Sequence, residues 1–427
     1  MSFIRLSGAA VQRYISIFVV AISLTSLPVF ASNAPLPLSL AKAMANTLAS
    51  NPQLHQFEPK NDALVGRRES STLGPQINAD IELENFAGSG NFSSTHNAEL
   101  TLALSSVIEL GSKRGARTML ADTKLQALEY RRQAATLDIL GSLTRDFIQT
   151  LAIQEYIALA EEARDLAVNT LAVLENRAKQ GAAPDYEIRR ARAALAQAKL
   201  RLNSLRREHQ RRSVKLAAYW GETAPKWIVL EGDLYQFREV VSYEELYREA
   251  QSSPAIAVFA SEARIRDAEL ALLKTQSISD INWQLGVRQF ENSDDTAFVA
   301  GLSIPLFSGK RNTGVLKAAR AAQNEVVFEQ ASALLKMHIQ LFEAYSQRAQ
   351  HLAAVNAYRN TILPELSASL RATQQAYEAG RYSYIELIAV QRELLNAKQA
   401  LIENAAAASL NQSTIEQLVA KPLTPRK

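Results

Sequence analysis

Two short stretches of the sequence are candidates for phosphate chemistry, because each places glycine, lysine and arginine just before a long helical pattern. They are ELGSKRGAR, which contains Gly111, and SGKRNTG, which contains Gly309. A phosphate-binding loop needs a glycine, four further residues and then Gly-Lys-Ser/Thr at the start of a helix. In the second stretch Ile304 occupies the place of the first glycine and Arg311 replaces the hydroxyl residue. The spacing therefore argues against a nucleotide site.

No other set of residues has the spacing of a catalytic or metal-binding site. The five histidines lie in different segments, and none has a second histidine or a carboxylate at the spacing of metal ligands more often than chance would give. The sequence has no cysteine and only four methionines, so thiolate ligands are excluded and a dedicated soft-metal site is not expected. We predict that the protein is not an enzyme and has no cofactor.

Carboxylates gather on one side of two alternating segments. INADIELENF and HNAELTLALSS place apolar and polar residues at alternate positions, which is the period of a β-strand. If the apolar side faces lipid, the acids face an aqueous lumen, where they would favour cations; Arg288 in a later strand offsets their charge in part. The alternative is that the acids only keep the lumen hydrated. The candidate residues are Asp80, Glu82, Glu84 and Glu99.

The segments belong to an internal repeat with an offset of about two hundred residues. Gly181 aligns with Gly380, and Glu187 aligns with Glu386. After each glycine, apolar residues recur at steps of three and four, which is typical of packed helices. These residues are Ile188, Ala191, Leu195, Ala198 and Leu202 in the first copy, and Leu387, Val390, Leu394, Ala397 and Leu401 in the second.

Both copies are expected to contain the same elements in the same order. Short helices precede a β-hairpin, a helical run of roughly 65 residues follows, and a glycine turn leads into a shorter returning helix. The long runs extend from about Lys113 to Ala178 and from about Lys310 to Tyr377, and Gly141 and Pro364 are their expected kinks. The expected domains are a first repeat at 32–240 (hairpin 75–107, helical hairpin 113–220, linker 221–240), a second repeat at 241–420 (hairpin 279–307, helical hairpin 310–419) and a tail at 421–427.

The N-terminus has the layout of an export signal. Residues 1–31 carry two arginines, an apolar run from Ile15 to Leu24 and a small-residue cleavage site at Ala31. Removal of this segment lowers the formal charge from +4 to +2, so the basic composition is no argument for a nucleic-acid partner. Without a cysteine the N-terminus cannot be lipidated through that residue. No later run of 18 apolar residues remains, so a membrane would have to be crossed by strands.

The sequence resembles the TolC-type outer-membrane efflux protein family. The resemblance rests on the duplicated order of elements, on the glycine turn followed by IELIAVQRELLNAKQAL, and on the strand exits ELGSKR and SGKR. ELGSKRGAR and GAAPDYE are most similar to the heavy-metal branch. Four strands cannot close a barrel, whereas three copies supply twelve. The resemblance implies a mainly α-helical fold with a β-barrel portion, in which a homotrimer forms a twelve-stranded barrel continuous with a long helical tunnel.

The resemblance also implies a function. It describes a passive exit duct in the cell outer membrane, in contact with outer-membrane lipid and with a helical extension into the periplasm. The implied partners are a periplasmic membrane-fusion adaptor and an inner-membrane RND-type pump, and the favoured cargo is heavy-metal cations. Two alternatives remain, namely export of drugs or other organic compounds through the same fold, and a periplasmic coiled-coil spacer that forms no channel.

The same resemblance assigns roles to the junctions between strands and helices. Gly111 and Gly309 would supply the loose backbone for the change of direction. The basic residues after them would reach the lipid headgroups or remain solvated in the first helical turn. These residues are Lys113, Arg114, Lys310 and Arg311.

The glycine turns at the far end are implied to form a periplasmic tip that docks the adaptor and closes the tunnel. Tyr377 and Glu386 match family positions of the closed constriction, but Ala389 stands where a second acid is expected. One carboxylate layer could therefore come from both repeats, and the alternative is ordinary surface charge. The candidate residues are Gly181, Asp185, Glu187, Tyr377, Gly380 and Glu386.

Overall fold

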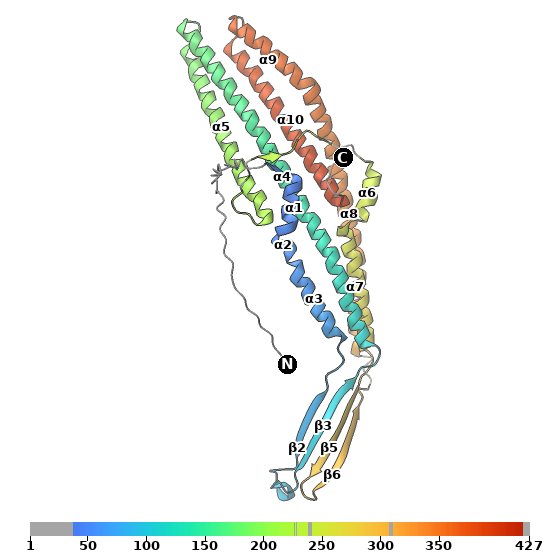
Figure 1. Cartoon of the computed structure of the whole chain (residues 1–427). Coiled ribbons are helices and arrows are strands. Elements are labelled where there is room, and N and C mark those ends of the chain that lie inside the picture. The colour runs from blue at the N-terminus through green and yellow to red at the C-terminus, as the bar shows by residue number, and fades with distance from the viewer. Residues whose placement is uncertain (1–36, 226, 228, 238–240, 307–310, 422–427) are drawn as a thin grey trace, which may run out of the picture.

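The protein is described by a computed structural model that covers residues 37–225, 227, 229–237, 241–306 and 311–421. The expected signal peptide at 1–31, most of the tail at 421–427, and Gly309 and Lys310 of the second junction lie outside these residues. The molecule is long and narrow, with a small β-sheet at one end and the turns of two helical hairpins at the other (Figure 1).

The sheet combines one β-hairpin from each repeat. Its strands are antiparallel and follow the order β2 (Asn78–Glu84), β3 (Glu99–Ile108), β5 (Ile281–Phe290) and β6 (Asp295–Ser303). The central pair, β3 with β5, joins the two repeats over ten residue pairs, from Glu99 opposite Phe290 to Ile108 opposite Ile281. Strands β2 and β6 form the outer edges, so the sheet is open on both sides within the described chain.

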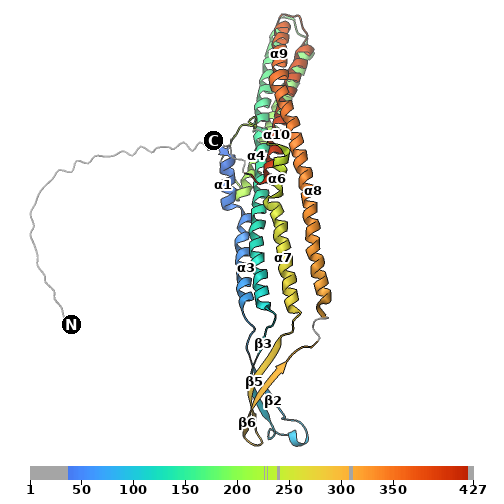
Figure 2. The ribbon, with the colours of Figure 1, turned by 90° about the vertical axis from the view of Figure 1, so that its right-hand side faces the viewer.

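Four helices continue from the sheet and lie side by side in the order α3 (Phe57–Thr72), α4 (Lys113–Lys179), α7 (Pro254–Gln276) and α8 (Thr313–Ala357). Figure 2 shows that they run nearly parallel to the long axis of the molecule. Helix α4 alone has 67 residues, which corresponds to roughly 100 Å at 1.5 Å per residue. Neither edge helix is covered by another described element along this stretch.

Farther from the sheet, different helices pack against α4 and α8. Helix α5 (Asp185–Ala217) returns along α4, while α10 (Tyr384–Val419) packs between α4 and the pair formed by α8 and α9 (Leu363–Glu378). A π-helical turn at Tyr358–Ile362 separates α8 from α9. Pro364 lies two residues after this turn, and because proline cannot donate a backbone hydrogen bond, the turn accommodates the missing helical bond.

Gly141 does not break the first long helix. Helix α4 runs through this residue, which is buried against α10. A Cβ atom at this position would overlap the side-chain amide of Gln417 on α10. The glycine expected as a kink is therefore a site of close approach between two helices.

A smaller group of elements packs against the middle of the long helices. It contains α1 (Leu40–Ser50), α2 (Pro52–His55) and α6 (Tyr243–Gln251), and a parallel pair between β1 (Leu38–Ser39) and β4 (Leu230–Glu231). The Gln154 side chain on α4 bonds both backbone groups of Leu230: Leu230 N donates to Gln154 Oε1 (2.7 Å) and Gln154 Nε2 donates to the Leu230 carbonyl (3.2 Å). The linker expected at 221–240 thus contains a strand that the sequence pattern did not indicate.

Burial is concentrated in separate clusters along the length of the molecule. One lies where α1, α4 and the linker meet, and includes Leu143, Phe147 and Leu234. Another joins α6, α8 and α10 around Leu341, and a third lies between the hairpin turns. None of the described helices has an apolar stretch long enough to cross a membrane.

Candidate functional site

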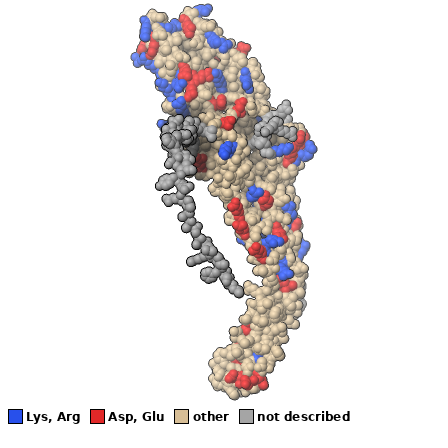
Figure 3. Space-filling view, in the orientation of Figure 1, with Lys and Arg blue, Asp and Glu red and all other residues tan. Residues whose placement is uncertain are grey.

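One face of the sheet is apolar and exposed. A single cross-strand row contains Ile81, Leu102, Val287 and Phe298, because these residues are paired in register across all four strands. Phe298 is 93% exposed and Ile81 is 76% exposed. In Figure 3 the sheet carries few charged side chains except near its far end. An apolar face of this extent is typical of a surface that contacts lipid or another protein.

The other face carries the candidate acids, and it is the more enclosed one. Thr101 and Ala103 on this face are 1% and 6% exposed. Gly286 on β5 lies so close to β3 that a Cβ atom there would be 2.7 Å from Ala103 Cβ, and only a residue without a side chain allows this approach. The strand register places Glu82 beside Thr101 and Glu84 beside Glu99 on this polar face.

Arg288 on β5 contacts two of the four candidate acids. Its Nη1 donates to Glu99 Oε2 (2.8 Å), its Nη2 donates to Glu84 Oε2 (2.9 Å) and its Nε donates to Thr101 Oγ1 (2.8 Å). Asn85 Nδ2 also donates to Glu99, at 2.8 Å. The sequence predicted a partial offset by Arg288 but could not identify its partners, which lie in the other repeat.

Asp80 and Glu82 differ from the other two acids. Within the described residues neither side chain has an ion pair or a hydrogen bond, and Glu82 is exposed. The four candidate acids are thus brought to one face, but they form two pairs with different surroundings.

The first junction between strand and helix contains two successive residues in the left-handed region. Gly111 has φ of +74° and Ser112 has φ of +60°, and α4 begins at the next residue. Lys113 is buried, and its Nζ lies 2.7 Å from Asp280 Oδ2, while Leu110 N donates to Asp280 Oδ1 at 3.0 Å. Lys113 therefore does not reach lipid headgroups or solvent as expected, because Asp280 from the second repeat holds it inward.

The other basic residues of the junctions point to the surface where they are described. Arg114 and Arg311 are exposed. A further ion pair, which the sequence analysis missed, joins Glu109 and Arg117; Arg117 Nη2 donates to Glu109 Oε2 at 3.0 Å. The hydrogen bond from Arg117 holds the pKa of the Glu109 carboxyl below its usual range. The opposite charges at the first and last positions of ELGSKRGAR, Glu109 and Arg117, were the sequence signal from which this pair could have been predicted.

At the far end, the two glycine turns have the same backbone geometry. Gly181 and Gly380 both have φ of +73°. Ala182 N donates to the Arg177 carbonyl and Arg381 N donates to the Ala376 carbonyl, each at 2.8 Å. These bonds satisfy carbonyls at the helix ends and are typical of helices that end at a left-handed glycine.

Tyr377 is buried between the two hairpins and is 3% exposed. The Arg177 guanidinium lies 4.5 Å from its ring centroid, and Arg177 Nη1 donates to the Tyr377 carbonyl at 2.6 Å. Tyr384 is equally buried, with Arg190 5.8 Å from its ring. Burial is the main cause that raises the pKa of both phenols, and the negative charge of Glu187 raises both further.

The acids at the two turns have different bonding. Glu386 accepts hydrogen bonds from Ser383 N (2.7 Å) and Ser383 Oγ (2.8 Å), which forms a capping box at the start of α10. Asp185 pairs with Arg189 in the same helix, and both side chains are largely exposed. Glu187 has the position equivalent to Glu386, but Pro184 precedes it and no side chain caps α5.

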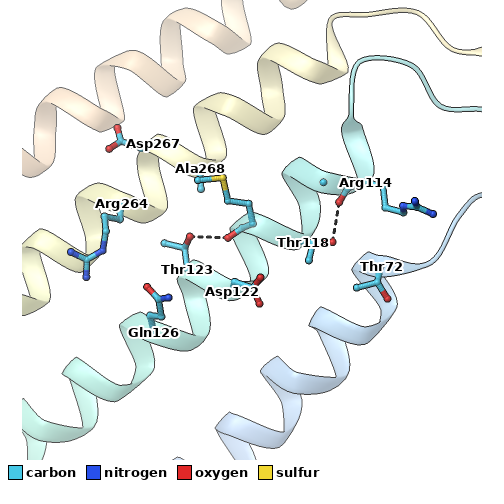
Figure 4. Close-up of a pocket in the computed structure, with 11 residues that line it drawn as sticks. Thr72, Arg114, Thr118, Asp122, Thr123, Gln126, Arg264, Asp267 and Ala268 are labelled. Atoms are coloured by element: carbon cyan, nitrogen blue, oxygen red, sulfur yellow. Dashed lines mark hydrogen bonds between the residues drawn. The ribbon is translucent and has the colours of Figure 1, made fainter.

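A hollow of ≈ 830 Å³ lies between α3, α4 and α7 near the sheet (Figure 4). Thr118 and Thr123 donate to carbonyls of their own helix, at 3.0 and 2.7 Å, and Asp122 pairs with Arg68. Most polar groups here are thus bonded within the protein. Across the described residues, no group of three or more His, Cys, Asp or Glu side chains is placed to hold a metal ion.

Comparison with known proteins decides the family. The model of the outer membrane efflux protein family matches residues 44–222 and 247–421, which correspond closely to the two repeats. The chain belongs to this family.

Among curated proteins, this outer membrane efflux protein is 25% identical over 372 residues to the cobalt-zinc-cadmium resistance protein CzcC of Cupriavidus metallidurans, with 87% of each chain covered. It is 24% identical over 297 residues to the pyoverdine export outer membrane protein OpmQ of Pseudomonas putida, covering 67% of this chain and 63% of OpmQ. Among solved structures it is similar to CusC, with a TM-score of 0.75, 15% identity and coverage of 90% of this chain and 92% of CusC. The fold is therefore that of the TolC-type channels.

Proposed function

We propose that this outer membrane efflux protein forms a homotrimeric exit duct, in which three four-stranded sheets close one twelve-stranded barrel. The open sheet carries this proposal. Its edges β2 and β6 have no partner in the described chain, its apolar face is exposed, and long helices continue from the same strands. Pairing with neighbouring copies removes both free edges of the sheet. The resulting twelve strands are more than the eight of the smallest membrane barrels.

The edge helix α8 supports the same assembly. Phe328, Leu335, Ile339 and Phe342 are more than half exposed and recur at steps of seven, four and three. This is the spacing of a helix that packs against another helix. In the proposed trimer a neighbouring copy covers this apolar stripe.

The proposed location is the cell outer membrane, with the apolar face of the sheet in lipid and the helices in the periplasm. Residues 1–31 would direct export and be removed, and no lipid would be attached through cysteine. The proposed partners are a periplasmic membrane-fusion adaptor and an inner-membrane RND-type pump. In this proposal the duct is passive, and the pump supplies the energy.

Heavy-metal cations are the proposed cargo. The resemblance to CzcC over 87% of both chains supports this cargo, and so do the acids on the polar face of the sheet. The resemblance to OpmQ favours an alternative, an organic export cargo, over a smaller share of the chain. In either case the chain would act as a passive conduit.

Growth of a strain that lacks the gene, with and without a plasmid copy, distinguishes these cargoes. Graded zinc, cadmium, cobalt, copper and silver are compared with dyes and detergents. We expect sensitivity to metals alone, rescued by the plasmid. Sensitivity to organic compounds alone would contradict the metal cargo and leave the channel function standing. Absence of conductance by the purified protein in planar bilayers would instead favour the periplasmic spacer.

We also propose that the glycine turns form the periplasmic tip, which docks the adaptor and gates the tunnel. Gly181 and Gly380 shape the turns, and Tyr377 packs them together. Glu187 and Glu386 would contribute one carboxylate layer, with Asp185 beside it. We expect the double substitution Glu187→Ala with Glu386→Ala to change both conductance and block by divalent ions. If neither changes, these acids do not form the gate.

A further inference from the structure

We infer that Arg288 sets the ion selectivity of the barrel by offsetting part of the negative charge of Glu84 and Glu99, so that Asp80 and Glu82 are the acids that attract cations most strongly. This inference rests on the proposed channel function. It assigns a specificity role to a basic residue in a lumen whose other charged candidates are acids.

All three nitrogens of the Arg288 guanidinium donate hydrogen bonds. Nη1 and Nη2 each donate to a carboxylate and Nε donates to the Thr101 hydroxyl, with distances of 2.8 to 2.9 Å. Thr101 is 1% exposed, and the Arg288 side chain is 27% exposed. A planar guanidinium held in this way is fixed in position, whereas a lysine could not bond all three groups with one geometry.

The position of this cluster follows from the pairing between repeats. Arg288 lies opposite Thr101 in the β3–β5 pair, and Glu99 lies opposite Glu84 in the β2–β3 pair. The arginine therefore reaches Glu99 on the neighbouring strand β3 and Glu84 on β2, one strand farther away. Because these residues lie near the loop end of their strands, the cluster occupies the end of the sheet farthest from the helices (Figure 1).

Asp80 and Glu82 lie on the same face but closer to the helices. Neither has an ion pair within the described chain, and Glu82 is exposed on the polar face. The four acids and Arg288 together have a net charge of −3 per chain: −2 from the two unpaired acids and −1 from Arg288 with Glu84 and Glu99. In a trimer every charge is repeated three times, and a ring of unpaired carboxylates lowers the barrier for cations.

Two substitutions change this balance in opposite directions. Arg288→Met removes the counter-charge and leaves four negative charges on the face, two of them newly unpaired. Glu84→Gln with Glu99→Gln removes the partners and leaves Arg288 as an unpaired cation. The first variant should therefore favour cations more strongly than the natural protein, and the second should favour them less.

The experiment measures reversal potentials of the purified full-length protein in planar bilayers across a potassium chloride gradient. We expect Arg288→Met to raise the ratio of cation to anion permeability by about twofold or more, because each subunit loses one fixed positive charge from the polar face. Glu84→Gln with Glu99→Gln should lower the ratio, and Asp80→Asn with Glu82→Gln should lower it too.

Two control variants separate charge from structure. Arg288→Lys keeps the positive charge but loses the bonds on three sides. Because the inference assigns selectivity to charge, this variant should keep the natural selectivity. Arg248→Met on the exposed surface of α6 removes the same charge far from the sheet and should change nothing.

The outcomes distinguish failure of this inference from failure of the proposed function. A natural protein that conducts no current contradicts the channel itself. A conducting channel in which Arg288→Met leaves the reversal potential unchanged overturns the role of Arg288. If Arg288→Met fails to assemble, the variant Glu84→Gln with Glu99→Gln tests the inference instead. A reversal potential unchanged in that variant also overturns the inference.

Discussion

The two glycine turns at the helical end have the same fold but use their acids differently. Both turns end a helix at a glycine with φ of +73° and make the same backbone hydrogen bonds. After Gly380, Ser383 and Glu386 form a capping box, whereas after Gly181 the equivalent of Ser383 is Pro184, which cannot cap. Glu386 is thus bonded to the start of its own helix, and its counterpart is not.

This difference shows that a duplicated position need not keep its role. Glu187 has no capping bond, and its charge acts on the buried phenols of Tyr377 and Tyr384 from the other repeat. Of the two matching acids, one serves local structure and the other is available for interactions between hairpins. The following substitutions test this asymmetry.

The largest effect is expected at Tyr377, which has no aromatic counterpart in the first turn because Ala178 occupies the equivalent position. Tyr377→Ala should lower the free energy of unfolding of the tip by about 3 kcal/mol, since it leaves a cavity between the hairpins. Hydrogen exchange of the helical tips measures this loss. Tyr186→Ala is the control, because Tyr186 is 57% exposed in the first turn. Equal effects of both substitutions would contradict the packing role.

The glycines should respond equally, since their geometry is the same. Gly181→Ala and Gly380→Ala should each cost about 1–2 kcal/mol, because a side chain disfavours the left-handed backbone. No atom lies within 4 Å of a Cβ at either position, so conformation alone decides the cost. Gly115→Ala in α4 has equal space without positive φ and should not destabilise. Local hydrogen exchange that differs between the two turn variants would show that the turns are not equivalent.

The capping box should make the two helix starts differ. Ser383→Ala should weaken the first turn of α10 by about 1 kcal/mol, because the hydroxyl that accepts from Glu386 N and donates to Glu386 Oε2 is lost. Pro184→Ser places serine three residues before Glu187 and should create the same box at α5. Amide hydrogen exchange in the first turns of α5 and α10 measures the effects of both substitutions. If Pro184→Ser leaves α5 unchanged, the proline does not account for the asymmetry.

The smallest effect is a dependence on pH confined to one turn. The hydrogen bonds from Ser383 lower the pKa of Glu386 below its usual value. A carboxyl whose pKa is lower in the folded state stabilises the fold above its unfolded pKa, and this stabilisation is lost as pH falls through the folded pKa. We expect a carboxyl ¹³C titration of Glu386 to move upward in Ser383→Ala. An unchanged titration would show that the box does not hold this carboxylate.

Local sequence signals predicted most of the helical architecture. The long helical run before the Gly181 turn was predicted from about Lys113 to Ala178, and α4 spans Lys113–Lys179. Among the ten predicted seam residues none is exposed, and five are fully buried. Such features depend on neighbours within a few residues, so a single sequence is enough to indicate them.

Features that join the two repeats could not be predicted. Lys113 meets Asp280, and Arg288 meets Glu84 and Glu99, only because β3 pairs with β5. No spacing rule identifies partners so far apart in sequence. The close approach at Gly141 has the same origin, since its cause is Gln417 on another helix.

The π-helical turn was only partly foreseeable. Pro364 predicted a disturbance, because proline removes a helical hydrogen bond. Its form, an added residue in the turn at Tyr358–Ile362, depends on how α8 and α9 both pack against α10. The second long run is therefore two helices, where the sequence pattern predicted one.

The short pair of β1 and β4 has a consequence for the order of folding. Leu38 and Leu230 are paired in register across almost the whole first repeat, yet each strand has only two residues. Closing so long a loop costs much entropy, and a contact this small cannot offset it until α4 has presented Gln154 to Leu230. We expect this pair to form late, which leaves the chain around Leu38 unpaired while the rest of the first repeat folds. Pulsed hydrogen exchange would show the amides of Leu38 and Leu230 protected after those of α4, and simultaneous protection would contradict this order.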